Sequence, residues 1–364
     1  MPEVRIDHAA LAANWRMLDA RTGTARTGAA VKADAYGLGA ADVARTLFEA
    51  GCRDFFVAWA DEGAGLREAL GVLDARIFVL QGIDAAAARL CREYALIPVL
   101  SAPEEVSAWI SGGGGQPAAI QIETGMNRLG LEGPALANAA DHVRDNRLTV
   151  TLVMSHLATA DDPASPLSAL QRQRLLEAAK LFPGVPLSLA NSAGIFLDTA
   201  YHLDLTRPGI ALYGGSAGPL SAGLIQPVAT LTATVLQLRT ARAGETAGYG
   251  ADALLTRPTR IATVGIGYAD GYLRSASGAG VPVRRQVPGP SVFVAGQRAP
   301  VLGRVSMDMT LVDVTDLREG AVKPGDTVEL FGRNVPIDEV AAAAGTISYE
   351  LLTGLGPRVL RRRY

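Results

Sequence analysis

Short apolar runs alternate with helix-like segments over roughly the first 220 residues, and this alternation restricts the fold more than any other feature of the chain. Strands that alternate with helices form parallel sheets. Eight repeats predict a TIM-like (β/α)8 barrel, and a doubly wound open sheet is the alternative. The candidate strands are Ala29–Ala33, Asp54–Ala58, Arg76–Leu80, Ile97–Leu100, Ala118–Ile122, Val150–Ser155, Pro186–Leu189 and Leu203–Thr206.

Segments with helical periodicity separate most of these runs. Asp7 is suited to cap a first helix, His8–Leu18. Further helices are expected at Ala41–Glu49, Asp61–Leu70, Asp84–Tyr94, Glu104–Ile110 and Leu167–Leu181.

The pattern changes near residue 225, where short β-rich runs begin and glycine-containing turns separate them. We therefore expect a (β/α)8 barrel domain over residues 8–225 and a C-terminal, mainly β-strand domain over residues 226–364, on which residues 1–7 could also pack. The terminal run Arg361-Arg362-Arg363 is interpreted as a solvated tail. The β-rich runs are Val228–Leu238, Arg260–Gly265, Val292–Val294, Thr310–Val314 and Thr327–Phe331.

Composition indicates an ordinary folded protein. The 364 residues are 49% hydrophobic and 19% charged, with a formal net charge of −2, which does not suit nucleic-acid binding. Two cysteines, Cys52 and Cys91, predict neither a disulfide framework nor a structural zinc site. Because the N-terminus lacks an apolar signal core and no apolar run is long enough for a bilayer, we expect a cytoplasmic protein without a membrane partner.

Lys32 is a rare residue in an unusual place. The chain has 34 basic residues, of which only Lys32, Lys180 and Lys323 are lysines. Lys32 follows an apolar run, so the pattern places its amine at the end of a buried strand. A buried amine is costly unless it is paired or used chemically, and a neutral amine can attack a carbonyl. A catalytic lysine and a structural pair with Asp34 are both consistent with the pattern.

The predicted barrel brings other polar groups towards this lysine. Active sites of such barrels lie at the C-terminal ends of the strands. Lys32 ends the first strand, Arg128 lies just past the fifth, His156 ends the sixth and Arg207 follows the eighth. We expect these four side chains at one mouth.

The loops after strands seven and eight form the usual phosphate site of these barrels. Ser192 and the backbone amides of Gly209 and Ile210 are suited to that role. A lysine, arginines and a phosphate site in one mouth indicate a phosphorylated carbonyl held as a Schiff base. Pyridoxal 5′-phosphate is the natural candidate.

An ordered set of motifs resembles the alanine racemases, a family of fold-type III pyridoxal-phosphate enzymes. The resemblance covers nearly the whole chain, and the set is far more specific than any single motif. The motifs are Val31-Lys32-Ala33-Asp34-Ala35-Tyr36-Gly37, Thr124-Gly125-Met126-Asn127-Arg128-Leu129-Gly130, Ser155-His156, Asn191-Ser192, Arg207-Pro208-Gly209-Ile210, Gly248-Tyr249-Gly250, Gly265-Ile266-Gly267-Tyr268-Ala269-Asp270-Gly271, Gly303-Arg304-Val305-Ser306-Met307-Asp308 and Thr346-Ile347-Ser348-Tyr349-Glu350.

The resemblance implies racemisation by two bases on opposite faces of the cofactor. Lys32 would hold the cofactor and act as one base, which requires its pKa to fall from about 10.4 in desolvated, cationic surroundings. Tyr249 would be the opposing base, contributed by the second subunit of a homodimer. Without the resemblance, a packing aromatic is the simpler interpretation of Tyr249. His156 would contact this tyrosine and link it to Arg207.

Arg207 resembles the arginine that faces the pyridine nitrogen of the cofactor. Because arginine is always charged, it keeps that nitrogen unprotonated. The carbanion would then be short-lived and reprotonated at the α-carbon, which favours racemisation over transamination. A structural ion pair with Asp204 is the alternative.

Further roles follow from the same resemblance. Arg128 would bind the phenolic oxygen of the cofactor and approach the substrate carboxylate, and Tyr36, Ser192 and Tyr349 would bind the phosphate. At Gln121 the chain departs from the pattern, since many members carry there a carbamylated lysine that orients the arginine. We hypothesise that the Gln121 amide oxygen, or a small bound anion such as chloride, holds Arg128.

The β domain would complete the substrate site. Met307, through its backbone amide, would contact the substrate carboxylate from the second subunit, with Asp308 beside it. Tyr268 and Tyr349 would form a narrow gate that excludes larger side chains.

The implied activity is the interconversion of L-alanine and D-alanine, which supplies D-alanine for the peptidoglycan of the cell wall. A broader amino-acid racemase, acting for example on serine, is the nearest alternative. A fold-type III decarboxylase usually carries an acid where Arg207 stands. A non-enzymatic pyridoxal-phosphate-binding protein resembles the barrel alone, so the β domain with Tyr249 argues against it.

Overall fold

The computed structural model describes residues 1–278 and 289–364, and the chain divides into two compact units. One unit comprises residues 11–212 and 216–226 and contains the barrel. The other comprises residues 1–10, 213–215 and 227–364 and contains the β domain.

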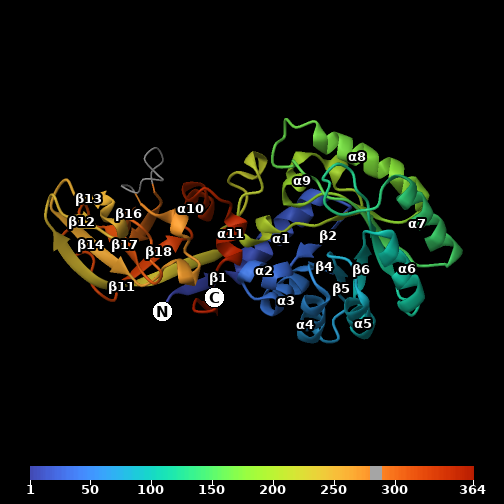
Figure 1. The fold of residues 1–364 in the computed structure, drawn as a ribbon, viewed down its shortest axis with the longest axis horizontal. Helices are drawn as coiled ribbons and strands as arrows, with labels where there is room; N and C mark the ends of the chain where they lie inside the picture. The colour runs from blue at the N-terminus through green and yellow to red at the C-terminus, as the bar shows by residue number, and fades with distance from the viewer. Residues whose placement is uncertain (279–288) are drawn as a thin grey trace. The chain divides into compact units, whose positions relative to one another are not determined.

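A curled parallel sheet forms the centre of the barrel unit (Figure 1). Seven strands pair in chain order from β3 to β9, while β10 pairs with β2. Backbone hydrogen bonds complete the ring, because the Asp204 amide donates to Leu187 at 3.0 Å and the Gly28 amide donates to Thr206 at 2.9 Å. The strands are β2 (Arg26–Thr27), β3 (Ala29–Ala30), β4 (Asp54–Val57), β5 (Arg76–Val79), β6 (Ile97–Leu100), β7 (Ala118–Gln121), β8 (Val150–Met154), β9 (Leu187–Ser188) and β10 (Leu205–Thr206).

The barrel is TIM-like, as predicted. Each predicted strand is found, although the first is shorter than expected and ends at Ala30. The longer strands are mainly apolar because both of their faces are largely buried, and their polar residues, such as Asp54, Arg76 and Gln121, stand at strand ends. Phe56, Phe78, Val99 and Met154, from four different strands, belong to one buried cluster. The rings of Phe56 and Phe78 are stacked with their centroids 4.8 Å apart.

Helices connect the strands, and each predicted helix begins within one residue of the expected position, whereas the helices at Gly133–Asp145 and Ser192–Leu197 were not predicted. The Asp7 carboxylate accepts a hydrogen bond from the Ala10 amide at 2.8 Å, and Asp84 accepts one from Ala87 at 2.8 Å, so both acids cap their helices. The main helices are α1 (His8–Thr22), α3 (Ala40–Ala50), α4 (Ala60–Leu70), α5 (Ala85–Glu93), α6 (Pro103–Gly112), α7 (Gly133–Asp145), α8 (Leu167–Ala178) and α9 (Ser192–Leu197).

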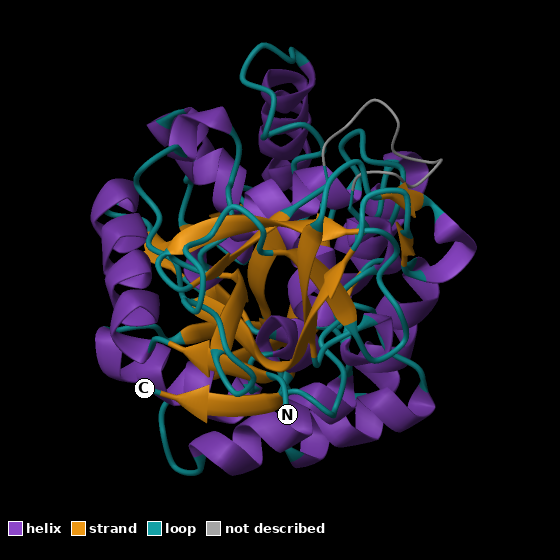
Figure 2. Cartoon of the chain, turned by 90° about the vertical axis from the view of Figure 1, so that its left-hand side faces the viewer, coloured by secondary structure: helices purple, strands orange, loops and turns teal. Residues whose placement is uncertain are grey.

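An eight-stranded sheet organises the β domain, and Figure 2 shows its strands in orange with both chain ends marked. The order is β14-β17-β16-β15-β18-β11-β1-β19, and β14 also pairs with β11. Six strands therefore close on one another. The strands are β1 (Glu3–Ile6), β11 (Ala229–Ala241), β14 (Thr259–Val264), β15 (Ser291–Val294), β16 (Gln297–Leu302), β17 (Thr310–Asp313), β18 (Thr327–Phe331) and β19 (Leu360–Arg363).

The interpretation of Arg361-Arg362-Arg363 as a solvated tail is wrong. These residues belong to β19, which pairs in parallel with β1. The guanidinium of Arg362 donates to the Glu3 carboxylate at 2.6 Å across this pair. One arginine of the positive run therefore pairs with an acid on a strand from the other end of the chain, which sequence proximity could not reveal.

The β domain also holds elements that the sequence did not indicate. They are the short pair β12 (Thr246–Ala247) and β13 (Ala253–Leu254), and the helices α10 (Ile337–Ala344) and α11 (Ser348–Thr353). Among the described residues, no helix has both the length and the apolar character needed to cross a bilayer.

Candidate active site

Lys32 stands directly after β3, at the start of an unusual turn, α2 (Lys32–Gly37). Four consecutive residues in it, Ala33 to Tyr36, have left-handed helical backbone angles, with φ between 52° and 57°. Such angles cost roughly 1–2 kcal/mol per residue for L-amino acids. The prediction that the first strand continues to Ala33 is therefore wrong. One strained turn holds both Lys32 and Tyr36.

Hydrogen bonds from outside and inside the turn offset this strain. The Glu62 carboxylate accepts from the Ala33 amide at 2.8 Å, and the Asp34 carboxylate accepts from the Ala40 amide at 2.7 Å. Because Asp34 is used in this way, it does not pair with Lys32. Lys32 forms no salt bridge within residues 1–278 and 289–364.

The surroundings of Lys32 favour its neutral amine. Burial lowers the pKa of Lys32, and the positive charges of Arg128 and Arg207 lower it further, while the Glu62 carboxylate opposes them. Desolvation and like charges both disfavour an ammonium ion. A neutral amine is the form that attacks a carbonyl.

Arg207 is buried at the end of the barrel strands, with 5% of its surface exposed. One terminal nitrogen donates to the Ser188 hydroxyl, and the other donates to the Ser155 carbonyl at 2.5 Å. The part of the chain that the structure describes places no carboxylate in a salt bridge with Arg207, and Asp204 instead accepts from the Leu187 amide at 2.7 Å. The alternative Arg207–Asp204 ion pair is therefore not formed. Burial lowers the pKa of Arg207 to about 9, which leaves the guanidinium charged at neutral pH.

His156 lies beside this buried cation. Its Nδ1 is 3.3 Å from Nη2 of Arg207. Burial, followed by the charges of Arg207, Arg128 and Lys32, lowers the pKa of His156 to about 3, so the ring is neutral at pH 7. A neutral ring that accepts at Nδ1 carries its proton on Nε2. The buried Gln171 amide donates to the His156 carbonyl at 2.8 Å and holds this segment in place.

Three of the predicted phosphate ligands, Tyr36, Ser192 and Gly209, lie close together. The Ser192 hydroxyl oxygen accepts from the Gly209 amide at 2.8 Å and from the Ala211 amide at 3.3 Å. A Cβ atom added at Gly209 would lie only 2.2 Å from the Tyr36 hydroxyl oxygen, so glycine is required for this close approach. Two hydroxyls and a backbone amide therefore converge on one small space after β9 and β10.

These residues fit pyridoxal phosphate. Hydroxyl and amide donors suit a phosphate dianion, and the barrel mouth also supplies a lysine with a lowered pKa for the aldehyde. The Ile210 amide adds a donor that, within the described residues, has no hydrogen-bond acceptor.

Glu123 shapes the loop that carries Arg128. Its carboxylate accepts from the amides of Gly125, of Met126 at 2.7 Å and of Arg128 at 3.3 Å. Burial raises the pKa of Glu123, but the amide hydrogen bonds outweigh that effect and lower it overall. The acid is thus held ionised by the backbone that it organises.

The Arg128 guanidinium itself is exposed, and in the described chain no hydrogen bond or salt bridge engages it. Gln121 is the half-buried last residue of β7. Its side chain makes no hydrogen bond to Arg128 in the described structure. The hypothesis that the Gln121 amide oxygen holds Arg128 is therefore not supported by a direct contact.

The predicted site residues of the β domain lie at its surface. Tyr249 is 69% exposed and Met307 is 53% exposed. The Tyr268 segment runs beside the Met307 segment, because the Tyr268 amide donates to Ser306 at 3.0 Å and the Ala269 amide donates to Met307 at 3.0 Å.

Arg358 ties these two segments together. Its guanidinium pairs with Asp270 and with Asp308, each at 2.9 Å. Asp270 is buried and also accepts from the Gly267 amide at 3.0 Å. Tyr349 lies in the first turn of α11 and is partly exposed.

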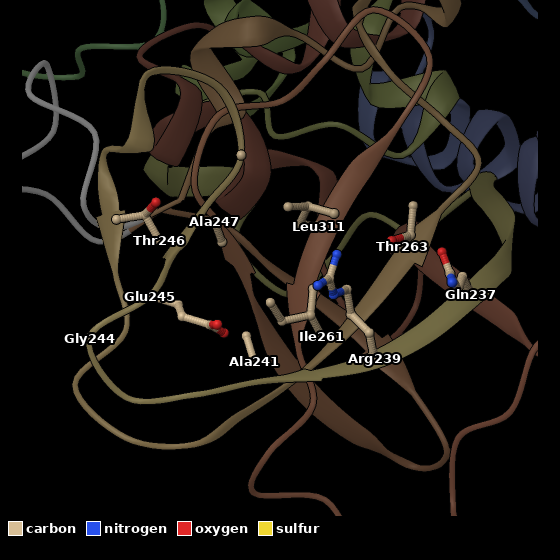
Figure 3. Close-up of a pocket in the computed structure, with 11 residues that line it drawn as sticks. Gln237, Arg239, Ala241, Gly244, Glu245, Thr246, Ala247, Ile261, Thr263 and Leu311 are labelled. Carbon is tan, nitrogen blue, oxygen red and sulfur yellow. The ribbon is translucent and has the colours of Figure 1, made fainter.

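The β domain also contains a cavity of about 570 Å³ (Figure 3). Its wall combines β11 and β14 with the turn around Glu245. Arg239 and Glu245 provide its charged side chains, and none of the predicted site residues lines it.

Sequence reasoning assigned no site role to the two glutamates of the barrel site. Glu62 and Glu123 act through backbone amides rather than through partner side chains. The only local signal was the position of Glu62 in the first turn of a predicted helix.

Comparisons with known proteins agree with this architecture. The family described as "Alanine racemase, N-terminal domain" matches residues 6–217, and "Alanine racemase, C-terminal domain" matches residues 228–363. An alanine racemase from Rhizobium meliloti (strain 1021) is 50% identical over 361 residues, covering 98% of this chain and 95% of that protein. A biosynthetic alanine racemase from Agrobacterium fabrum is 49% identical, with 98% and 92% coverage.

Solved structures show the same likeness. The crystal structure of alanine racemase from Bartonella henselae with covalently bound pyridoxal phosphate matches with a TM-score of 0.91 and 34% identity, covering 100% of this chain and 99% of that one. A TIM-like barrel with a lysine after its first strand, followed by a mainly β domain, defines a fold-type III pyridoxal-phosphate enzyme. Within that class, the chain belongs to the alanine racemase family.

Proposed function

We propose that this protein is an isomerase that interconverts L-alanine and D-alanine with pyridoxal 5′-phosphate as its cofactor. The observation that carries the proposal is the buried Arg207, held by neutral groups and next to a neutral His156, in the same barrel as Lys32. A decarboxylase of this class would be expected to carry an acid at the Arg207 position. A charged arginine there keeps the cofactor nitrogen unprotonated.

Residues of the barrel would hold the cofactor. Lys32 would attach it, and Ser192, Gly209, Ile210 and Tyr36 would bind its phosphate, together with Tyr349. When bound, the cofactor withdraws electrons from the α-carbon of the amino acid and so eases removal of its proton.

Two bases would then exchange the α-proton. Lys32 would serve the D-enantiomer, and Tyr249 of a second copy would serve the L-enantiomer. A tyrosine hydroxyl with a pKa of about 10 is a weak base alone, so it needs a partner. His156 would contact this hydroxyl. Burial, followed by the charge of Arg207, lowers the pKa of His156 and keeps its ring neutral, with Nδ1 3.3 Å from Nη2 of Arg207.

The substrate would be selected by charge and by size. Arg128 and the Met307 amide, with Asp308 beside it, would bind the carboxylate. Tyr268 and Tyr349 would restrict the space for a side chain to that of a methyl group.

The cellular setting is also part of the proposal. The protein would act in the cytoplasm as a homodimer and supply D-alanine for peptidoglycan. Residues 8–225 would form the cofactor-binding domain and residues 226–364 the domain that contributes the opposing base.

Chiral analysis of the product tests the function. Purified holoprotein given L-alanine should form D-alanine, and given D-alanine should form L-alanine, until the two are equal. Serine run in parallel distinguishes a broader racemase. Release of carbon dioxide from a basic amino acid without D-alanine formation would show a decarboxylase instead, and binding of the cofactor with neither reaction would favour a non-enzymatic binding protein.

A further inference from the structure

Glu62 connects three separate segments of the barrel. It lies in the first turn of α4, where its Oε2 accepts from the Ala58 amide at 2.7 Å and from the Trp59 amide at 3.3 Å. Its Oε1 reaches across to the Ala33 amide at 2.8 Å. The two oxygens of one carboxylate therefore join the end of β4, the start of α4 and the residue that follows Lys32.

The Ala33 contact occurs where the backbone is least stable by itself. Ala33 is the first of four residues with left-handed angles, and none of the four is a glycine. Other backbone hydrogen bonds of the turn join residues close in sequence, such as the bond from the Ala35 amide to the Val31 carbonyl at 2.8 Å. Within the described residues, the bond from the Ala33 amide to Glu62 is the one hydrogen bond that joins the backbone of Ala33 or Asp34 to an element distant in sequence.

Glu105 provides an internal comparison. It occupies the equivalent first turn of α6, and its carboxylate accepts from the Ser101 amide at 2.6 Å and from the Ser101 hydroxyl at 3.2 Å. Glu105 thus caps a β/α join as Glu62 does, but within the described residues its carboxylate accepts no hydrogen bond from a distant segment. The additional bond of Glu62 is directed at the lysine turn.

We propose that Glu62 is a positioning residue for Lys32: by accepting the Ala33 hydrogen bond, it fixes the left-handed turn that aims the lysine amine and the Tyr36 hydroxyl at the cofactor. This inference rests on the proposed cofactor role of Lys32. A carboxylate is suited to the position because it presents two acceptor oxygens and no donor, so it can satisfy amides on both sides at once. A glutamine would turn its NH2 group towards one set of N–H donors.

The charge of Glu62 is consistent with this role. Among the described charged groups that act on Lys32, Glu62 is the one anion, and it opposes the effects of Arg128 and Arg207 on the pKa of the amine. The amine is therefore surrounded by two cations in the mouth and one carboxylate behind its own turn.

Glu62→Ala and Glu105→Ala form a matched pair, because each removes one helix-capping carboxylate. The dissociation constant of pyridoxal phosphate is measured on each holoprotein by visible absorbance, together with visible circular dichroism and the urea midpoint. Loss of one charge-assisted hydrogen bond in the turn should raise the dissociation constant of Glu62→Ala roughly tenfold and change its visible circular dichroism. Glu105→Ala should change the dissociation constant less than about twofold.

Glu62→Gln is the second variant, for the case in which the alanine variant does not fold. It should show the same loss of cofactor affinity, since it cannot satisfy both sets of amides. Equal cofactor affinity in the Glu62 and Glu105 variants, or a fall in urea midpoint alone, would overturn the inference. These measurements need no turnover, so a wild type that binds the cofactor but fails to racemise alanine would refute the proposed function without affecting this result.

Discussion

Nη2 of Arg207 lies 3.3 Å from Nδ1 of His156, and the same nitrogen donates to the Ser155 carbonyl at 2.5 Å. A buried cation is thereby held by neutral acceptors, while the neighbouring ring remains neutral. The pair links the proposed cofactor-nitrogen contact to the proposed tyrosine base.

Arg207→Lys should lower kcat/KM for alanine by about tenfold to a hundredfold. A lysine keeps the charge but cannot present the planar fork that reaches Ser155, Ser188 and His156 together. Racemisation assays with cofactor content measured in parallel check this. Arg172→Lys, at a half-buried arginine that donates to the Ala200 carbonyl, is the control. Retention of full activity by Arg207→Lys would contradict the role of the fork.

His156→Gln should flatten the acid side of the stability profile. The folded-state pKa of about 3 lies below the unfolded value of about 6.5, so the unfolded chain binds more protons between them. This contribution to stability is complete above about pH 6.5 and is lost as the pH falls towards 3. Urea midpoints measured from pH 7 to pH 4 should therefore fall more steeply for the wild type than for His156→Gln. Parallel curves would mean that His156 titrates normally.

Tyr249→Phe should reduce racemisation by about 10²–10⁴-fold, the usual contribution of a general base. Cofactor affinity should stay near that of the wild type, because the proposed role of Tyr249 is proton transfer. Tyr94→Phe, which removes an exposed hydroxyl bonded to Glu68, is the matched control. A loss of cofactor as large as the loss of activity would rule against the base assignment.

Glu123→Gln should raise KM for alanine by about tenfold while leaving cofactor affinity unchanged. The glutamine amide cannot accept all the backbone bonds that shape the Arg128 loop. Since the folded pKa of Glu123 is depressed, its stabilising effect is present above about pH 4.3 and is lost as the pH falls through the folded pKa. Glu245→Gln, in a surface turn where the carboxylate accepts from the Arg242 amide, should leave KM unchanged.

Gln121→Ala separates the two ways in which Arg128 could be oriented. If the Gln121 amide contributes, KM for alanine should rise severalfold in Gln121→Ala. This rise should be smaller than the loss of a full charge-assisted hydrogen bond would cause. If a small anion orients Arg128 instead, replacing chloride with a bulkier anion should raise KM in the wild type. Unchanged substrate affinity in both experiments would remove both proposals.

Periodicity predicted the barrel because its strands are buried on both faces and its helices on one face. These burial patterns can be recognised from residues that are close in sequence. It could not show that Arg361 to Arg363 form a strand, because the partner strand β1 lies at the other end of the chain. The predicted first strand extends too far, to Ala33, for a related reason. Ala33 to Tyr36 have no local preference for left-handed angles, and a contact from Glu62 helps to impose them.

The sequence by itself determined the class of the fold, the family and the candidate residues, since periodicity and ordered motifs are local or read along the chain. Only the tertiary structure decided which of those residues interact. In it, Asp34 and Asp204 bind backbone amides and do not pair with Lys32 and Arg207. His156 instead lies next to Arg207. The tertiary structure also brought in Glu62 and Glu123, whose effects pass through backbone amides. Hydrogen bonding and desolvation depend on distances that closure of the barrel creates, and no spacing along the chain encodes them.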